Sequence, residues 1–176
     1  DLVTFSGDKL LGAVQCGIIA GKKDLIEKIR KNPMKRALRV DKLTLTILNA
    51  TLKLYNEPSA LAQHLPLLRT LTLSHETLIE RADQIIEGLP DHLHGELVQS
   101  TAQIGSGALP DQTIASVAVK LSHPNMSAQK LANALRAAST PIIGRIKDDD
   151  VLLDMRGAQP LDELISTLRQ AIQGTD

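Results

Sequence analysis

The second half of the chain alternates strand and helix signals in an order that few folds can accommodate. Glu96–Gln103 and Ile114–Leu121 alternate apolar and polar residues as strands do, and a helical pattern follows them. Two further strands, Pro141–Ile146 and Val151–Met155, precede a last helix that starts near Pro160. The order strand, strand, helix, strand, strand, helix predicts a small α+β sandwich with two helices on one face of a sheet.

The first half has a different pattern. Leu2–Phe5 and Gly17–Gly21 have the composition of short strands, and Lys22–Lys31 carries apolar residues at helical spacing. Two strands so close together, followed by a helix, indicate the edge of an α/β sheet. Asp41 is placed to cap a further helix, and a long helical stretch is expected from residue 61 to residue 85. Pro66 should either start the second part of this stretch or kink it.

Breaks in these patterns predict three segments. Gly88-Leu89-Pro90 ends the long helical stretch and is the best candidate for a domain boundary. We therefore expect residues 1–57 to be the end of one domain, 58–89 to be connecting helices, and 90–176 to be a small α+β domain.

The composition excludes several classes of protein. Lys and Arg together number 20, as do Asp and Glu, which excludes a uniformly basic nucleic-acid binder and an acidic tail protein. The single cysteine, Cys16, cannot form an internal disulfide and favours a reducing compartment. No apolar run approaches the roughly 20 residues of a membrane span, and no signal peptide is visible. We expect a cytoplasmic protein without a membrane partner.

Charge is nevertheless unevenly distributed along the chain. Residues 22–42 contain nine Lys or Arg against three Asp or Glu, whereas residues 147–176 contain three against seven. Arg36 and Arg39 would share one face of a helical turn and could clamp a tetrahedral anion. From the pattern alone, an ordinary basic surface is the safer interpretation.

Lys9 follows the first strand on a turn of small and polar residues, Ser6-Gly7-Asp8. An amine at the end of a strand can form a Schiff base with a cofactor aldehyde, and small neighbours leave room for the ring. A solvated turn lysine is the favoured alternative when only the spacing is considered. The five histidines share no metal-ligand spacing, so we expect no metal site.

Six blocks of sequence resemble the bacterial selenocysteine synthase family, the L-seryl-tRNA(Sec) selenium transferases. They occur in the family's order over nearly the whole chain. The blocks are Ser6-Gly7-Asp8-Lys9-Leu10-Leu11-Gly12, Gly21-Lys22-Lys23, residues 31–42, Gln103–Pro110, Pro141-Ile142-Ile143-Gly144-Arg145-Ile146 and Leu152-Leu153-Asp154-Met155-Arg156.

The resemblance implies a fold-type I enzyme that uses pyridoxal 5'-phosphate to replace the hydroxyl of seryl-tRNA(Sec) with selenium from selenophosphate. It implies that Lys9 forms the Schiff base, with Asp8 and Ser6 beside the cofactor, and that Arg36 and Arg39 hold the donor. Residues 1–57 would be the end of the cofactor-binding large domain. The implied partners are seryl-tRNA(Sec), selenophosphate and further copies of the chain, as a decamer built of dimers.

Two departures from the family pattern keep alternatives open. Ala13-Val14 stands where the family usually has Gly-Pro, and the resemblance covers only the carboxy-terminal part of the family. The 176 residues alone are therefore expected to be inactive, because the amino-terminal part would contribute most tRNA and cofactor contacts. The alternatives are a related fold-type I enzyme that catalyses β-elimination on an amino acid or amino sugar, and a non-catalytic interaction domain of that fold.

Overall fold

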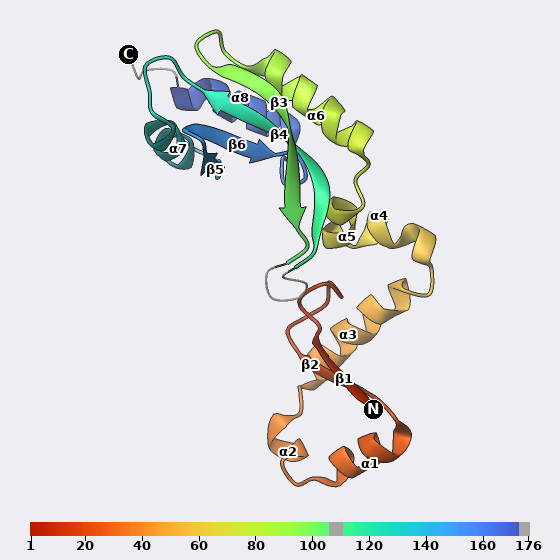
Figure 1. Ribbon diagram of the computed structural model, residues 1–176. Helices are drawn as coiled ribbons and strands as arrows, with labels where there is room; N and C mark the ends of the chain where they lie inside the picture. Colours follow the sequence, from red (N-terminus) through yellow and green to blue (C-terminus); the bar gives the residue numbers. More distant parts are fainter. Residues whose placement is uncertain (106–110, 173–176) are drawn as a thin grey trace. The chain divides into compact units, whose positions relative to one another are not determined.

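The computed structural model describes residues 1–105 and 111–172, and its helices and strands form two compact units (Figure 1). The first unit holds residues 1–72 and 105, and the second holds residues 73–104 and 111–172. Part of one resembling block, residues 106–110, lies outside the described residues.

The second unit contains an antiparallel sheet in the order β3-β4-β6-β5. Its long strands are β3 (His94–Gln103) and β4 (Thr113–Ser122), which pair over their whole length, and its shorter ones are β5 (Arg145–Lys147) and β6 (Asp150–Asp154). The alternation of apolar and polar residues thus identified the two long strands, β3 and β4. The mixed helix and sheet content agrees with the expected α/β and α+β class at that level.

Three helices bury one face of this sheet, where two were expected. They are α6 (His75–Gly88), α7 (Ala128–Arg136) and α8 (Leu161–Ile172), and Figure 1 shows α6 and α8 side by side along the sheet. The helix that was not expected in this layer is α6. Its apolar stripe of Leu78, Ala82 and Ile85 is fully buried in the common core. This core is aliphatic and includes Val117, Val119, Leu121, Leu131, Leu135, Val151, Leu153 and Leu168.

The strand expected over Pro141–Ile146 is wrong in its first part, since β5 begins only at Arg145. The Ile142 amide donates to the Leu135 carbonyl of α7 at 2.9 Å, so this irregular segment is held at the end of α7 instead of pairing in the sheet. Asp148 and Asp149 connect β5 to β6 with φ values of 51° and 61°. Two such residues make the tight hairpin turn that suits the twist of paired strands.

The first unit begins with a two-stranded antiparallel hairpin. β1 (Leu2–Ser6) pairs with β2 (Gly17–Gly21) so that Leu2 lies opposite Gly21 and Ser6 opposite Gly17. The helices α1 (Lys23–Lys31), α2 (Lys35–Leu38) and α3 (Lys42–Leu54) follow. The predicted cap is confirmed, because the Asp41 carboxylate accepts from the Thr44 amide at 2.9 Å.

The helical stretch expected from residue 61 to residue 85 is divided at two places; the break at Pro66 is confirmed, whereas the one before α6 was not expected. The chain forms a 3-10 turn, η1 (Pro58–Ala60), then α4 (Leu61–His64), α5 (Pro66–Leu71) and α6. Leu65 is extended because the proline that follows it disfavours helical backbone. The Ser74 hydroxyl accepts from the Thr77 amide and starts α6 as a separate helix. Among the helices in the described ranges, none has the length and apolar character needed to cross a bilayer.

Candidate active site

Residues 7–16 connect β1 to β2 and carry Lys9; we call them the 7–16 connection. The Gly7 amide donates to the Cys16 carbonyl at 2.9 Å, and the Ala13 amide donates to the Gly7 carbonyl at 2.8 Å. A β-carbon on Gly7 would lie 2.6 Å from both Cys16 Sγ and the Val14 carbonyl oxygen. Glycine at position 7 therefore lets the base of the connection close.

Lys9 and Asp8 form an ion pair on the surface of this connection. Lys9 Nζ lies 2.6 Å from Asp8 Oδ2, and the two side chains are 61% and 25% exposed. The pKa of Asp8 lies below its usual value, chiefly because Lys9 donates to the carboxylate, with a smaller contribution from the Ser6 hydroxyl. The structure thus brings together the three residues Ser6, Asp8 and Lys9.

A tyrosine from outside the connection also holds it. The Tyr55 hydroxyl donates to the Leu11 carbonyl at 2.9 Å, although the two residues are 44 positions apart. Tyr55 follows α3 directly, and burial raises the pKa of its phenol. Sequence reasoning missed this contact, and the only available signal was that Tyr55 is the chain's single tyrosine.

Arg36 and Arg39 lie at a separate place in the first unit. Arg36 is in α2, Arg39 is the residue that ends this helix, and both side chains are exposed. The Lys22 amide donates to the Asp1 carbonyl at 3.2 Å, so α1 begins at the end of the hairpin opposite Lys9. Figure 1 shows α1 and α2 beyond that end of β1 and β2. The two arginines are thus three positions apart at one short helix, and the structure does not bring them to Lys9.

The two residues that depart from the family pattern fit the connection without strain. Outside glycine, Asp148 and Asp149 are the described residues with positive φ, so Ala13 and Val14 have ordinary backbone conformations. Gly12, immediately before them, has a φ of 72° and supplies the left-handed residue of the connection. Ala13 and Val14 therefore stand in the connection without backbone strain.

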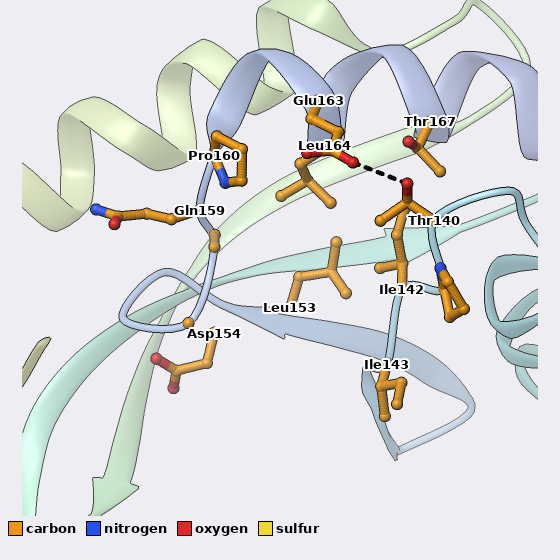
Figure 2. A pocket seen from close by; sticks show the side chains of 13 residues that line it. Thr140, Ile142, Ile143, Leu153, Asp154, Gln159, Pro160, Glu163, Leu164 and Thr167 are labelled. Atoms are coloured by element: carbon orange, nitrogen blue, oxygen red, sulfur yellow. Dashed lines mark hydrogen bonds between the residues drawn. The ribbon is translucent and has the colours of Figure 1, made fainter. Parts of the chain in front are cut away.

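The second unit has a pocket of about 280 Å³ that the sequence did not indicate (Figure 2). Its floor is apolar, with Ile142, Leu153 and Leu164, and the Thr140 hydroxyl donates to the Glu163 carboxylate at 2.8 Å on one wall. None of the predicted site residues lines this pocket. Within the described part of the chain, no three His, Cys, Asp or Glu side chains are grouped as metal ligands.

Most of the sequence matches one protein family. A family model described as "SelA: L-seryl-tRNA selenium transferase" matches residues 1–159. The chain belongs to this family. Proteins named L-seryl-tRNA(Sec) selenium transferase from Pasteurella multocida (strain Pm70) and Aquifex aeolicus (strain VF5) are 45% and 43% identical to it over 97% and 98% of its length. The one from Alkaliphilus metalliredigens (strain QYMF) is 43% identical over 89% of its length.

The similarity to the selenium transferase family extends over both units of this chain. The chain covers 38% of the Pasteurella and Aquifex relatives and 34% of the Alkaliphilus relative. It therefore spans little more than a third of the length of these relatives. The Lys9 turn and the Arg36 and Arg39 helix both fall inside the matched residues.

Proposed function

We propose that this chain provides the cofactor lysine and the donor-binding arginines of a selenium transferase that converts seryl-tRNA(Sec) to selenocysteinyl-tRNA(Sec). Membership of the selenium transferase family supports the reaction, and the exposed amine of Lys9 beside Asp8 supports the site. Because the chain spans little more than a third of its relatives' length, the activity is proposed for a protein that also has the remaining length.

The residues of the 7–16 connection fit pyridoxal phosphate as the cofactor. Lys9 presents an amine at a strand end, where it is 61% exposed and can reach an aldehyde. Lys9 would hold the cofactor, and Asp8 and Ser6 would lie beside it. When bound, pyridoxal phosphate supplies an electron sink that allows the seryl α-proton and then the β-hydroxyl to leave.

Asp8 would position the lysine. Its carboxylate accepts directly from Lys9 Nζ and thereby limits the directions in which that flexible side chain can point. Its lowered pKa keeps this carboxylate charged at neutral pH. Asp8 would therefore orient Lys9 before the cofactor binds.

Arg36 and Arg39 would bind selenophosphate as a pair. Both are exposed and belong to a segment with a large excess of positive charge. Guanidinium groups suit a phosphate-like trianion because they donate two parallel hydrogen bonds. In the overall reaction the β-carbon–oxygen bond of the seryl group and the selenium–phosphorus bond of the donor break, and a β-carbon–selenium bond forms. The water that leaves the seryl group is matched by the water that hydrolyses the donor, so phosphate is the net by-product.

The remaining proposals concern the whole protein. We assign residues 1–57 to the end of a fold-type I cofactor-binding domain, 58–89 to connecting helices and 90–176 to the small domain. We also propose a cytoplasmic homo-oligomer, a decamer built of dimers, with most tRNA contacts in the part of the protein that this chain does not include.

The test is a chimera in which this chain replaces the matching segment of the Aquifex aeolicus relative. Borohydride reduction with pyridoxal phosphate, followed by peptide mapping, should place the cofactor mass on Lys9. The chimera should also convert seryl-tRNA(Sec) with selenophosphate, and Lys9→Ala should abolish both results. Lys22→Ala is the matched control, because Lys22 is 65% exposed and also pairs with an aspartate. Cofactor mass on a different lysine, with Lys9 unmodified, would contradict the proposal.

A further inference from the structure

One peptide group of the 7–16 connection is held at both of its ends. The carbonyl of the Leu11–Gly12 peptide accepts from the Tyr55 hydroxyl at 2.9 Å. The amide of the same peptide, on Gly12, donates to the Lys9 carbonyl at 2.9 Å. A hydrogen bond at one end of a peptide polarises the group and strengthens the bond at the other end. Tyr55 is therefore linked to the backbone of Lys9 through a single rigid plane.

Tyr55 is itself well anchored. It is the residue that ends α3, and its backbone amide donates to the carbonyls of Leu52 and Lys53. Asp41 caps the other end of this 13-residue helix. The phenol is half-buried, and its raised pKa keeps it protonated, hence able to donate, at neutral pH. The donor of the Leu11 bond is thus fixed to a regular element.

The connection by itself is less constrained. Its remaining backbone bonds join residues inside it, such as Gly7 to Cys16 and Ala13 to Gly7. These bonds close the base of the connection, whereas Lys9 lies near its tip with an exposed side chain. Leu65, also from outside the connection, lies near Gly12, since a β-carbon added to Gly12 would be 3.5 Å from Leu65 Cδ2. Leu65 is 5% exposed and supplies a packed surface on that side.

We propose that Tyr55 is a positioning residue for Lys9, acting through the Leu11–Gly12 peptide. This inference rests on the proposed function for the role of Lys9 itself. Loss of the Tyr55 hydroxyl leaves the Leu11 carbonyl without its donor, so the peptide plane can rotate and weaken the Gly12 to Lys9 bond. The side chain of Lys9 then points in several directions instead of one.

The first measurement is hydrogen exchange of the Gly12 amide in the full chain. Tyr55→Phe removes one oxygen and keeps the ring, and should speed Gly12 exchange by about 2- to 12-fold, the range for loss of one net hydrogen bond. Thr46→Val is the matched control, because it removes a hydroxyl of α3 that bonds only the Lys42 carbonyl of its own helix. The chain has one tyrosine and no tryptophan, so absorbance at the tyrosinate band reports Tyr55 alone. The wild-type tyrosine should titrate above its ordinary pKa.

The second measurement is trapping of pyridoxal phosphate on Lys9 in the Aquifex chimera, at a cofactor concentration below saturation. Tyr55→Phe should lower the trapped fraction by about 2- to 12-fold, and Thr46→Val should leave it unchanged. Unchanged Gly12 exchange in Tyr55→Phe, or faster exchange with unchanged trapping, overturns the positioning role. If pyridoxal phosphate is not trapped on Lys9 in the wild-type chimera, the proposed function is overturned, and this inference with it. Normal trapping in the wild type together with reduced trapping in Tyr55→Phe supports both.

Discussion

Gly88, the last residue of α6, lies against Ile165 of α8 so closely that a larger residue does not fit between them. A β-carbon on Gly88 would be 2.6 Å from Ile165 Cγ2. The Gly88 carbonyl also accepts from Arg169 Nε of α8 at 2.8 Å. Glycine at the end of α6 therefore allows the two helices to meet.

Gly88→Ala should destabilise the second unit. The added methyl would overlap Ile165, and overpacking of this kind typically costs about 1–3 kcal/mol. Urea unfolding followed by circular dichroism measures the change. Gly17→Ala is the control, because a β-carbon at Gly17 has no atom within 4 Å. Equal stability of Gly88→Ala and wild type would show that α6 and α8 adjust freely.

Ser116→Ala should also lower the stability of the second unit. Ser116 is fully buried on β4, and its hydroxyl donates to Asp154 Oδ1 of β6 at 2.7 Å. Removal of a donor to a carboxylate costs about 1.5–3 kcal/mol. Ser166→Ala is the comparison, since that serine is exposed and bonds only a carbonyl of its own helix. Denaturant midpoints of the two variants should differ, and equal midpoints would contradict the assigned role of Ser116.

Replacement of Arg36 and Arg39 by Ala should weaken use of selenophosphate in the Aquifex chimera and leave cofactor trapping on Lys9 intact. Loss of charge-assisted bonds worth about 1.5–3 kcal/mol corresponds to one to two decades in affinity. Lys35→Ala, which removes one positive charge from the same helix α2, is the control. If the double variant saturates with the donor as the wild type does, the arginines form only a solvated surface.

The Asp41 cap should make α3 sensitive to acid. Hydrogen bonds from Thr44 hold the pKa of Asp41 below its usual 3.8. The charged carboxylate is therefore favoured in the folded chain, so its stabilising effect is present above pH 3.8 and is lost as the pH falls through the lowered folded value. The Thr44 amide shift, followed by nuclear magnetic resonance, should move in that acidic range. Asp41→Asn keeps a capping oxygen that does not titrate, so the movement should disappear.

The sequence predicted the parts of the fold that depend on local pattern. Period-two alternation located β3 and β4, and the cap at Asp41 located the start of α3. The break before α6 was missed because the apolar stripe keeps helical spacing across Thr72–Ser74, and only the capping serine marks the interruption. A cap signal inside a continuous stripe is therefore more informative than the stripe.

The candidate site was predictable to a similar extent. The adjacency of Asp8 and Lys9 follows from the sequence, and the structure pairs their side chains, while their role in cofactor binding stays a prediction. The bond from Tyr55 to Leu11 spans 44 residues, and no local periodicity encodes a contact of that separation. The position of Arg36 and Arg39 relative to Lys9 depends on how β1 pairs with β2, because this pairing puts the start of α1 at the end of the hairpin opposite Lys9. Local periodicity does not encode that pairing either.

The acceptor of the Tyr55 bond is a main-chain oxygen, and every amino acid offers the same carbonyl. The identity of residue 11 is therefore chemically irrelevant to this link, whereas position 55 must carry a hydroxyl at the right reach and position 12 must tolerate a φ of 72°. Selection for the orientation of Lys9 would therefore act on positions 12 and 55, which are far apart in the sequence. It would place no requirement on the side chain at position 11.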